Sequence, residues 1–304
     1  MGHLLECRRL RSARFAAKLL LGTTWLVLGL PYLAATQTLT WDAIAEGLSM
    51  TIWTPQVPCQ DVPPFIAIDI DPDRYRFAVH HYQREGLSVP PNIHQWQKQT
   101  GHELVFNAGL FREDYSYLGL LYAGGRPLGG KRHAIWMGLF VAEPTTSALR
   151  QARVLDLAVD TFDEQQPTYQ EAAQSLMLLD RTGKVRVRQT GKRAQQTILA
   201  ELGNGHILLL KSTDVVSLHA VGQCVRDAFP AVRQAMAMDG GSSSDVALNE
   251  VTRQTTSKAG GLHPWLPLLG DGSTAHIGLP AVIGISPRRT APENQAGQEK
   301  PARR

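Results

Sequence analysis

Cysteine is scarce in this sequence, with three residues among 304. So few cysteines exclude a small domain held together mainly by a framework of disulfides. Cys7 precedes an apolar segment and is expected to stay in a reducing cytosol. Cys59 and Cys224 could pair in an oxidising compartment, and the sequence alone leaves both states open.

Metal-ligand patterns are also absent. The adjacent His80 and His81 and the single His133 have no partner at the spacing of a zinc site. No loop of the EF-hand type occurs, although loop acids such as Asp271 leave calcium open as an alternative. We therefore expect neither a metal nor another cofactor.

Positive charge is concentrated at the two ends of the chain. The formal net charge is +4, and basic residues crowd the segments 8–18 and 288–304. Because the middle of the chain is close to neutral, the charge does not indicate a nucleic-acid partner.

No formally charged residue occurs between Lys18 and Asp42, and residues 19–33 are strongly apolar. Basic residues before an apolar run are typical of a membrane-targeting segment whose N-terminus stays inside, and fit a buried N-terminal helix less well. A large residue at the outer position of each candidate cleavage site favours a signal anchor over a cleaved signal peptide in residues 1–40. We expect a membrane partner through this segment and an extracytoplasmic location, periplasmic or at the cell surface, for an anchored or secreted protein.

Residues 45–286 contain no internal repeat and no clear linker, which predicts one domain. Two helices are expected, one at 93–100 closed by Gly101 and one starting after Ser217. With many short apolar runs between turn residues, the pattern predicts an α+β domain around a mixed β-sheet with few helices. Residues 287–304 are expected to form a disordered basic tail. The expected strands cover 65–70, 75–79, 104–106, 118–122, 135–141, 176–179, 185–187, 197–200, 206–210, 235–238 and 281–285.

An acidic, glycine- and serine-rich turn follows the expected strand at 235–238. It consists of Asp239, Gly240, Gly241, Ser242, Ser243 and Ser244. The glycines allow a sharp turn or a close approach to a ligand. Serine hydroxyls and turn amides can hold an anionic or polyhydroxylated group, and a carboxylate at a strand end is well placed for catalysis. An ordinary turn capped by the Asp239 side chain is the alternative.

A second motif, Asn107-Ala108-Gly109-Leu110-Phe111, follows the expected strand at 104–106. Together with the turn at 239–244, this motif resembles the phosphodiester glycosidase family, the N-acetylglucosamine-1-phosphodiester alpha-N-acetylglucosaminidase-like enzymes. The resemblance extends over about residues 66–285. It rests on both motifs occurring in this order and at this separation.

The resemblance implies hydrolysis of the glycosidic bond of a sugar-1-phosphodiester or a related envelope glycan. In that case Asp239 would be the catalytic carboxylate, and the Asn107 amide would hold sugar hydroxyls or a substrate carbonyl. Asn107 as a simple strand-end turn residue is the alternative. The residues implied in substrate binding are Gly109, Gly240, Gly241, Ser242, Ser243, Gln196 and Arg193.

One position departs from the family pattern. Gln196 stands where the family has an arginine that can grip a phosphate with two hydrogen bonds. Arg193 lies three residues earlier and faces the opposite side of an extended strand, so only a loop could bring it, Arg132 or Lys131 to the site. A second hypothesis is therefore a catalytically weakened family member that binds glycans or assists envelope or exopolysaccharide assembly, with a carbohydrate or sugar phosphate as its partner.

Overall fold

The computed structural model describes residues 39–258, 263–269 and 276–289. The expected membrane segment and most of the expected tail lie outside these residues, so both stay predictions. Among the described residues, no helix combines the length and apolar character needed to cross a membrane. The folded chain continues past 286, because Pro287 ends the last strand and Arg288 forms an ion pair of 2.7 Å with Glu143.

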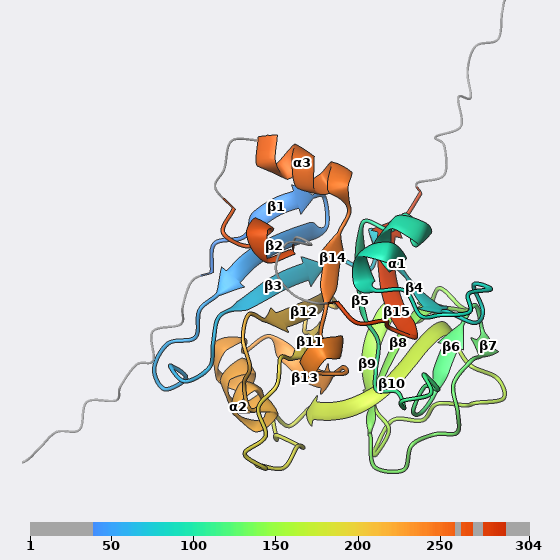
Figure 1. The fold of residues 1–304 in the computed structure, drawn as a ribbon. Coiled ribbons are helices and arrows are strands. Elements are labelled where there is room, and N and C mark those ends of the chain that lie inside the picture. Colours follow the sequence, from blue (N-terminus) through green and yellow to red (C-terminus); the bar gives the residue numbers. More distant parts are fainter. Residues whose placement is uncertain (1–38, 259–262, 270–275, 290–304) are drawn as a thin grey trace, which may run out of the picture. The chain divides into compact units, whose positions relative to one another are not determined.

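Eleven strands form the larger of two β-sheets (Figure 1). They are β1 (Asp42–Ala45), β2 (Leu48–Trp53), β3 (Phe65–Ile70), β6 (Leu121–Ala123), β7 (Arg126–Pro127), β8 (Gly138–Pro144), β9 (Ala152–Asp156), β10 (Tyr169–Leu179), β11 (Thr197–Leu202), β12 (Ile207–Ser212) and β13 (Val232–Ala237). The main path runs β1-β2-β3-β12-β11-β13-β10-β6-β7, while β8 pairs with both β10 and β9.

The smaller sheet has four strands in the order β14-β5-β15-β4. Its strands are β4 (Tyr75–His81), β5 (Leu104–Asn107), β14 (Val246–Leu248) and β15 (Ala281–Pro287). The α-helices are α1 (Ile93–Thr100), α2 (Leu218–Ala228) and α3 (Glu250–Lys258), and two short 3-10 helices cover Gly241–Ser243 and Leu266–Leu269.

Every pairing between the described strands is antiparallel. A single, mostly β domain with few helices is therefore confirmed, whereas the predicted mixed sheet is wrong. The strand–helix–strand pattern of β12, α2 and β13 is typical of a parallel crossover. Here β11 lies between the two strands and is antiparallel to both. Strands β12 and β13 therefore run in the same direction but do not pair with each other.

The two sheets pack against each other through the largest core cluster. Alternate residues of β3, such as Ile66 and Ile68, share this cluster with Phe106 of β5 and Ile283 of β15. The intervening Ala67 faces the other side of the large sheet, where α2 packs. Because β3 is buried on both faces, its sequence is a continuous apolar run rather than an alternating one.

Both expected helices form, and their ends agree with the sequence signals. Asn92 and Gln95 make a reciprocal capping box at the start of α1, and Gly101 ends it at a φ of 68°. Ser217 precedes α2 as expected, although its side chain makes no capping hydrogen bond. On the outer face of the small sheet, Trp96 of α1 packs against residues of β5 and β15.

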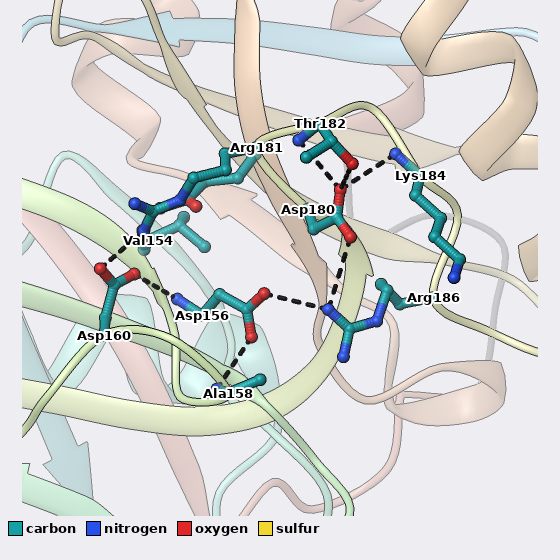
Figure 2. A network of polar contacts seen from close by, with 10 residues as sticks. Val154, Asp156, Ala158, Asp160, Asp180, Arg181, Thr182, Lys184 and Arg186 are labelled. Carbon is teal, nitrogen blue, oxygen red and sulfur yellow. Dashed lines mark hydrogen bonds and ion pairs between the residues drawn. The ribbon is translucent and has the colours of Figure 1, made fainter.

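Carboxylates and arginines form a network at the ends of β9 and β10 (Figure 2). Arg186 lies between Asp156 and Asp180, at 3.1 and 3.5 Å, and Arg181 contacts Asp160 at 2.6 Å. Burial opposes ionisation of Asp180, but hydrogen bonds from the following turn outweigh it and lower the pKa of this carboxyl. Since each carboxylate is already bonded, the network stabilises the strand ends.

Cys59 and Cys224 form a disulfide that joins the loop after β2 to α2. The bridged residues are 165 positions apart, so the bridge restricts a large part of the unfolded chain. The pairing that the sequence left open is thus present in the structure.

Replacing both bridged cysteines, as Cys59→Ala with Cys224→Ala, is expected to lower the free energy of unfolding by about 2–4 kcal/mol. Denaturant unfolding with and without a reductant measures the effect. The reductant should bring the wild type down to the level of the double variant and leave that variant unchanged. Equal stability of the oxidised wild type and the double variant would contradict a stabilising bridge.

Candidate active site

The two motifs singled out from the sequence meet where the two sheets come together. Asn107 is the last residue of β5, and Asp239 follows β13 by two positions. The Asp239 N–H donates to the Ala108 carbonyl at 3.2 Å, and the Asn107 side-chain amide donates to the Asp239 carbonyl at 2.8 Å. The structure therefore brings both predicted catalytic residues into one site.

The side chain of Asn107 is fully engaged with the protein. Its Nδ2 donates to the carbonyls of Ala108 and Asp239, and its Oδ1 accepts from the Thr197 hydroxyl at 2.8 Å and the Asp245 N–H at 3.1 Å. An asparagine amide has two donor and two acceptor positions, and all four are filled. With an exposed fraction of 1%, Asn107 positions Asp239 and leaves no hydrogen-bonding position for a sugar.

Asn107, Thr197, Ser244 and the backbone at Asp239 and Asp245 form one hydrogen-bonded joint. Thr197 and Ser244 were not among the predicted site residues. The Thr197 hydroxyl lies 2.8 Å from that of Ser244, and both residues are buried. Since Thr197 gives its one hydroxyl hydrogen to Asn107, Ser244 is the donor of this pair. A threonine opening the apolar run of β11 is the sequence signal that could have pointed to it.

Asp239 occupies a partly buried position. Burial raises the pKa of its carboxyl to about 6, against hydrogen bonds from the Ser243 hydroxyl and the Gly240 N–H. The Gly240 contact measures 2.9 Å. Burial also raises the pKa of the nearby Tyr117 phenol, and the charge of Asp239 adds to that effect. A carboxyl with a pKa near 6 can exchange a proton close to neutral pH.

Both glycines of the turn are required by the backbone. Gly241 has a φ of 68° and donates its N–H to the Gln195 carbonyl at 2.8 Å. A side chain at Gly240 would come within 2.9 Å of the same carbonyl. The sharp turn is thus confirmed, and the close approach that Gly240 allows is to the chain itself.

The two serines predicted to bind substrate differ in their surroundings. Ser242 is exposed. Ser243 is buried and bonds the Asp239 carboxyl.

Gln196 and Gly109 have structural partners. Gln196 is buried, and its side-chain amide donates to the carbonyls of Ala194 and Val216 at 3.1 and 3.3 Å. Gly109 donates its N–H to the Tyr117 hydroxyl at 3.0 Å, and a side chain there would clash with that oxygen. Their predicted roles in substrate binding stay predictions.

The arginines considered as replacements for the missing phosphate clamp have other contacts. The Arg193 guanidinium donates to the Val215 carbonyl at the surface. Arg132 pairs with Glu164 at 2.8 Å and also donates to the Phe162 carbonyl. Their described partners thus lie outside the turn at 239–244.

Three charged or titratable residues border the joint and were also missed. Lys211 of β12 pairs across the sheet with Thr197, and burial lowers the pKa of its ammonium to about 8. The Asp245 carboxylate lies 2.5 Å from Nδ1 of His276. Strand register and loop packing bring these residues to this region, so no local sequence pattern predicts them as site residues.

Replacing Thr197 with valine is expected to lower the free energy of unfolding by about 1–3 kcal/mol, because a buried Asn107 oxygen and the Ser244 hydroxyl each lose a partner. Denaturant unfolding measures the loss. Thr145→Val removes an exposed hydroxyl contact and is the matched control, with a change within about 0.5 kcal/mol. Equal effects of the two substitutions would argue against a hydrogen-bonded joint.

No family model and no curated protein sequence matches this chain. Solved structures do resemble it. A hypothetical protein from Synechocystis superposes with a TM-score of 0.55 at 12% identity, over 84% of this chain and 65% of that one. The zebrafish N-acetylglucosamine-1-phosphodiester alpha-N-acetylglucosaminidase catalytic domain, auto-inhibited by its pro-peptide, gives 0.54 at 13% identity over 84% and 85%. At these identities the likeness shows a shared fold: this chain folds like a phosphodiester glycosidase catalytic domain.

Proposed function

We propose that this protein hydrolyses the glycosidic bond of a sugar-1-phosphodiester or a related envelope glycan. The observation that carries the proposal is Asp239, whose carboxyl pKa burial raises to about 6. Its backbone carbonyl accepts a hydrogen bond from the Asn107 side chain at the junction of the two sheets. The fold shared with a phosphodiester glycosidase catalytic domain supports the substrate class.

Cleavage of this substrate does not depend strongly on a second residue that donates a proton to the leaving group. A phosphomonoester leaves readily without prior protonation, whereas most glycosidases need a carboxylic acid to protonate the leaving oxygen. The remaining requirements are to stabilise a positively charged sugar in the transition state and to activate water. Asp239, mostly ionised at pH 7, serves both purposes in this proposal.

The surrounding residues have separate roles in the proposed mechanism. Asn107 and Thr197 position Asp239 through the buried joint, and Ser243 orients its carboxylate. Ser242, an exposed residue of the turn, is proposed to contact the sugar. Gly240 and Gly241 provide the turn that presents these side chains.

The proposed location is outside the cytoplasm, with residues 1–40 as the membrane anchor or signal. The Cys59–Cys224 disulfide supports this location, because structural disulfides persist in oxidising compartments.

A non-catalytic glycan-binding or envelope-assembly protein is the second candidate function. The observation favouring it is Gln196, whose amide is bonded to two backbone carbonyls at the position where the resembling family has arginine. Fold alone does not decide between an enzyme and a binding protein.

Replacing Asp239 with asparagine is expected to lower the hydrolysis rate by a factor on the order of 10² or more, because an amide cannot accept the proton from water. The assay is the release of free sugar from an N-acetylglucosamine 1-phosphodiester. Asp227→Asn, at an exposed ion pair on α2, is the control and should keep the full rate. Equal rates for wild type and Asp239→Asn would exclude Asp239, and no turnover by the wild type would favour the binding protein.

The kcat/KM of the wild type is expected to rise as the pH increases through about 6, because Asp239 must be ionised to act as a base. Rates measured between pH 4 and 8 would show this rise in kcat/KM. An ordinary aspartate ionises near pH 4, so with an unshifted pKa the rise would occur near pH 4 instead. A rate that falls across the same range would assign Asp239 the opposite role, that of a general acid.

A further inference from the structure

Lys211 projects from the same sheet face as the joint around Asn107. It lies on β12 directly opposite Thr197 of β11. Side chains of directly paired residues in an antiparallel sheet stand next to each other on one face. Since the Thr197 hydroxyl bonds Asn107 and Ser244, the Lys211 side chain runs beside this joint.

The Lys211 ammonium shares a hydrogen-bonding partner, Gln195, with the turn at 239–244. Its Nζ donates to the Ser212 carbonyl at 2.9 Å and to Oε1 of Gln195 at 3.4 Å. The carbonyl of the same Gln195 accepts the Gly241 N–H at 2.8 Å. One residue, Gln195, therefore connects the lysine to the loop that carries Asp239.

Lys211 is a half-buried cation whose neighbours do not neutralise it. Within the described part of the chain, no carboxylate lies within 4 Å of its Nζ, since the structure's ion pairs there do not include it. Asp245 is the nearby acid that acts on its charge, and that carboxylate is bonded to His276 and to the Val246 N–H. Of the three ammonium donors, two have acceptors among the described residues, and both acceptors are neutral.

Such a position is unfavourable in a protein without a ligand. Removing a lysine from water costs free energy unless its charge is paired, and the half-burial of Lys211 carries part of that cost. A bound anion would supply the missing charge and the third hydrogen-bond acceptor. Because Lys211 is not fully buried, an anion can reach it from solvent.

We propose that Lys211 binds the anionic phosphate group of the substrate beside Asp239, where Gln196 replaces the arginine of the resembling family. The inference rests on the proposed function for its substrate class, a sugar-1-phosphodiester. Lys211 lies on β12, opposite Thr197 rather than opposite Gln196, so the proposed cation comes from a different strand than the family arginine.

Titration calorimetry with inorganic phosphate at fixed ionic strength tests this subsite without any hydrolysis. Lys211→Met should weaken phosphate binding by about tenfold or more, as expected for loss of a charge-assisted contact. Lys211→Arg keeps the charge and should retain most of the affinity. Lys192→Met makes the same change at an exposed lysine and should leave binding unchanged.

Thermal unfolding of the same proteins separates binding from a structural role. Lys211→Met should be as stable as the wild type or more stable, because an unpaired buried charge is removed. A clear loss of stability without a specific loss of phosphate affinity would make Lys211 a structural residue and overturn the proposal. Wild-type protein that does not bind phosphate would overturn it as well.

Hydrolysis assays on Lys211→Met then distinguish the two proposals. If phosphate binding depends on Lys211 but no sugar phosphodiester is cleaved by the wild type, the anion subsite stands and the catalytic proposal fails. If cleavage proceeds equally well in wild type and Lys211→Met, the catalytic proposal stands and the subsite at Lys211 is refuted.

Discussion

The candidate site depends on one buried side-chain amide, that of Asn107. Three of its four hydrogen bonds connect β5 of the small sheet with the start of β11 and with the two loop segments at Asp239 and Asp245. A shift of one sheet relative to the other would break at least one of these bonds in a place that water does not reach, at a cost of about 1–3 kcal/mol for each unsatisfied group. Asparagine suits this position because aspartate lacks the two donors and leucine lacks every polar atom.

The joint has a direct consequence for the charges around it. It keeps the turn that carries Asp239 against the protein, and burial there raises the pKa of this carboxyl to about 6. In Lys211, which pairs with Thr197 across the sheet, burial lowers the pKa of the ammonium to about 8. An acid and a cation with pKa values shifted toward neutral pH are thus both connected to this hydrogen-bonded region, and such shifted values are common at functional sites.

Local patterns in the sequence were enough to find the two motifs and the two main helices. Asp239 and Asn107 were predicted because a polar, glycine-containing segment directly after an apolar strand is an unusual local combination. Thr197, which bonds Asn107, and Lys211, which pairs with Thr197, were not predicted as site residues. Their pairing depends on the strand register between β11 and β12, which single strands do not reveal. The mixed sheet was wrong for a related reason, since the sequence does not show that β11 inserts between β12 and β13.

The central claim is that Asn107 holds Asp239 in its buried position. A carboxyl-carbon NMR titration of Asp239, in the wild type and in a folded Asn107→Ala variant, tests it directly. The account predicts a pKa of about 6 in the wild type and a shift toward the ordinary value of 3.8 in the variant, because the released turn becomes hydrated. An ordinary pKa in the wild type, or the same raised pKa in both proteins, would contradict the account.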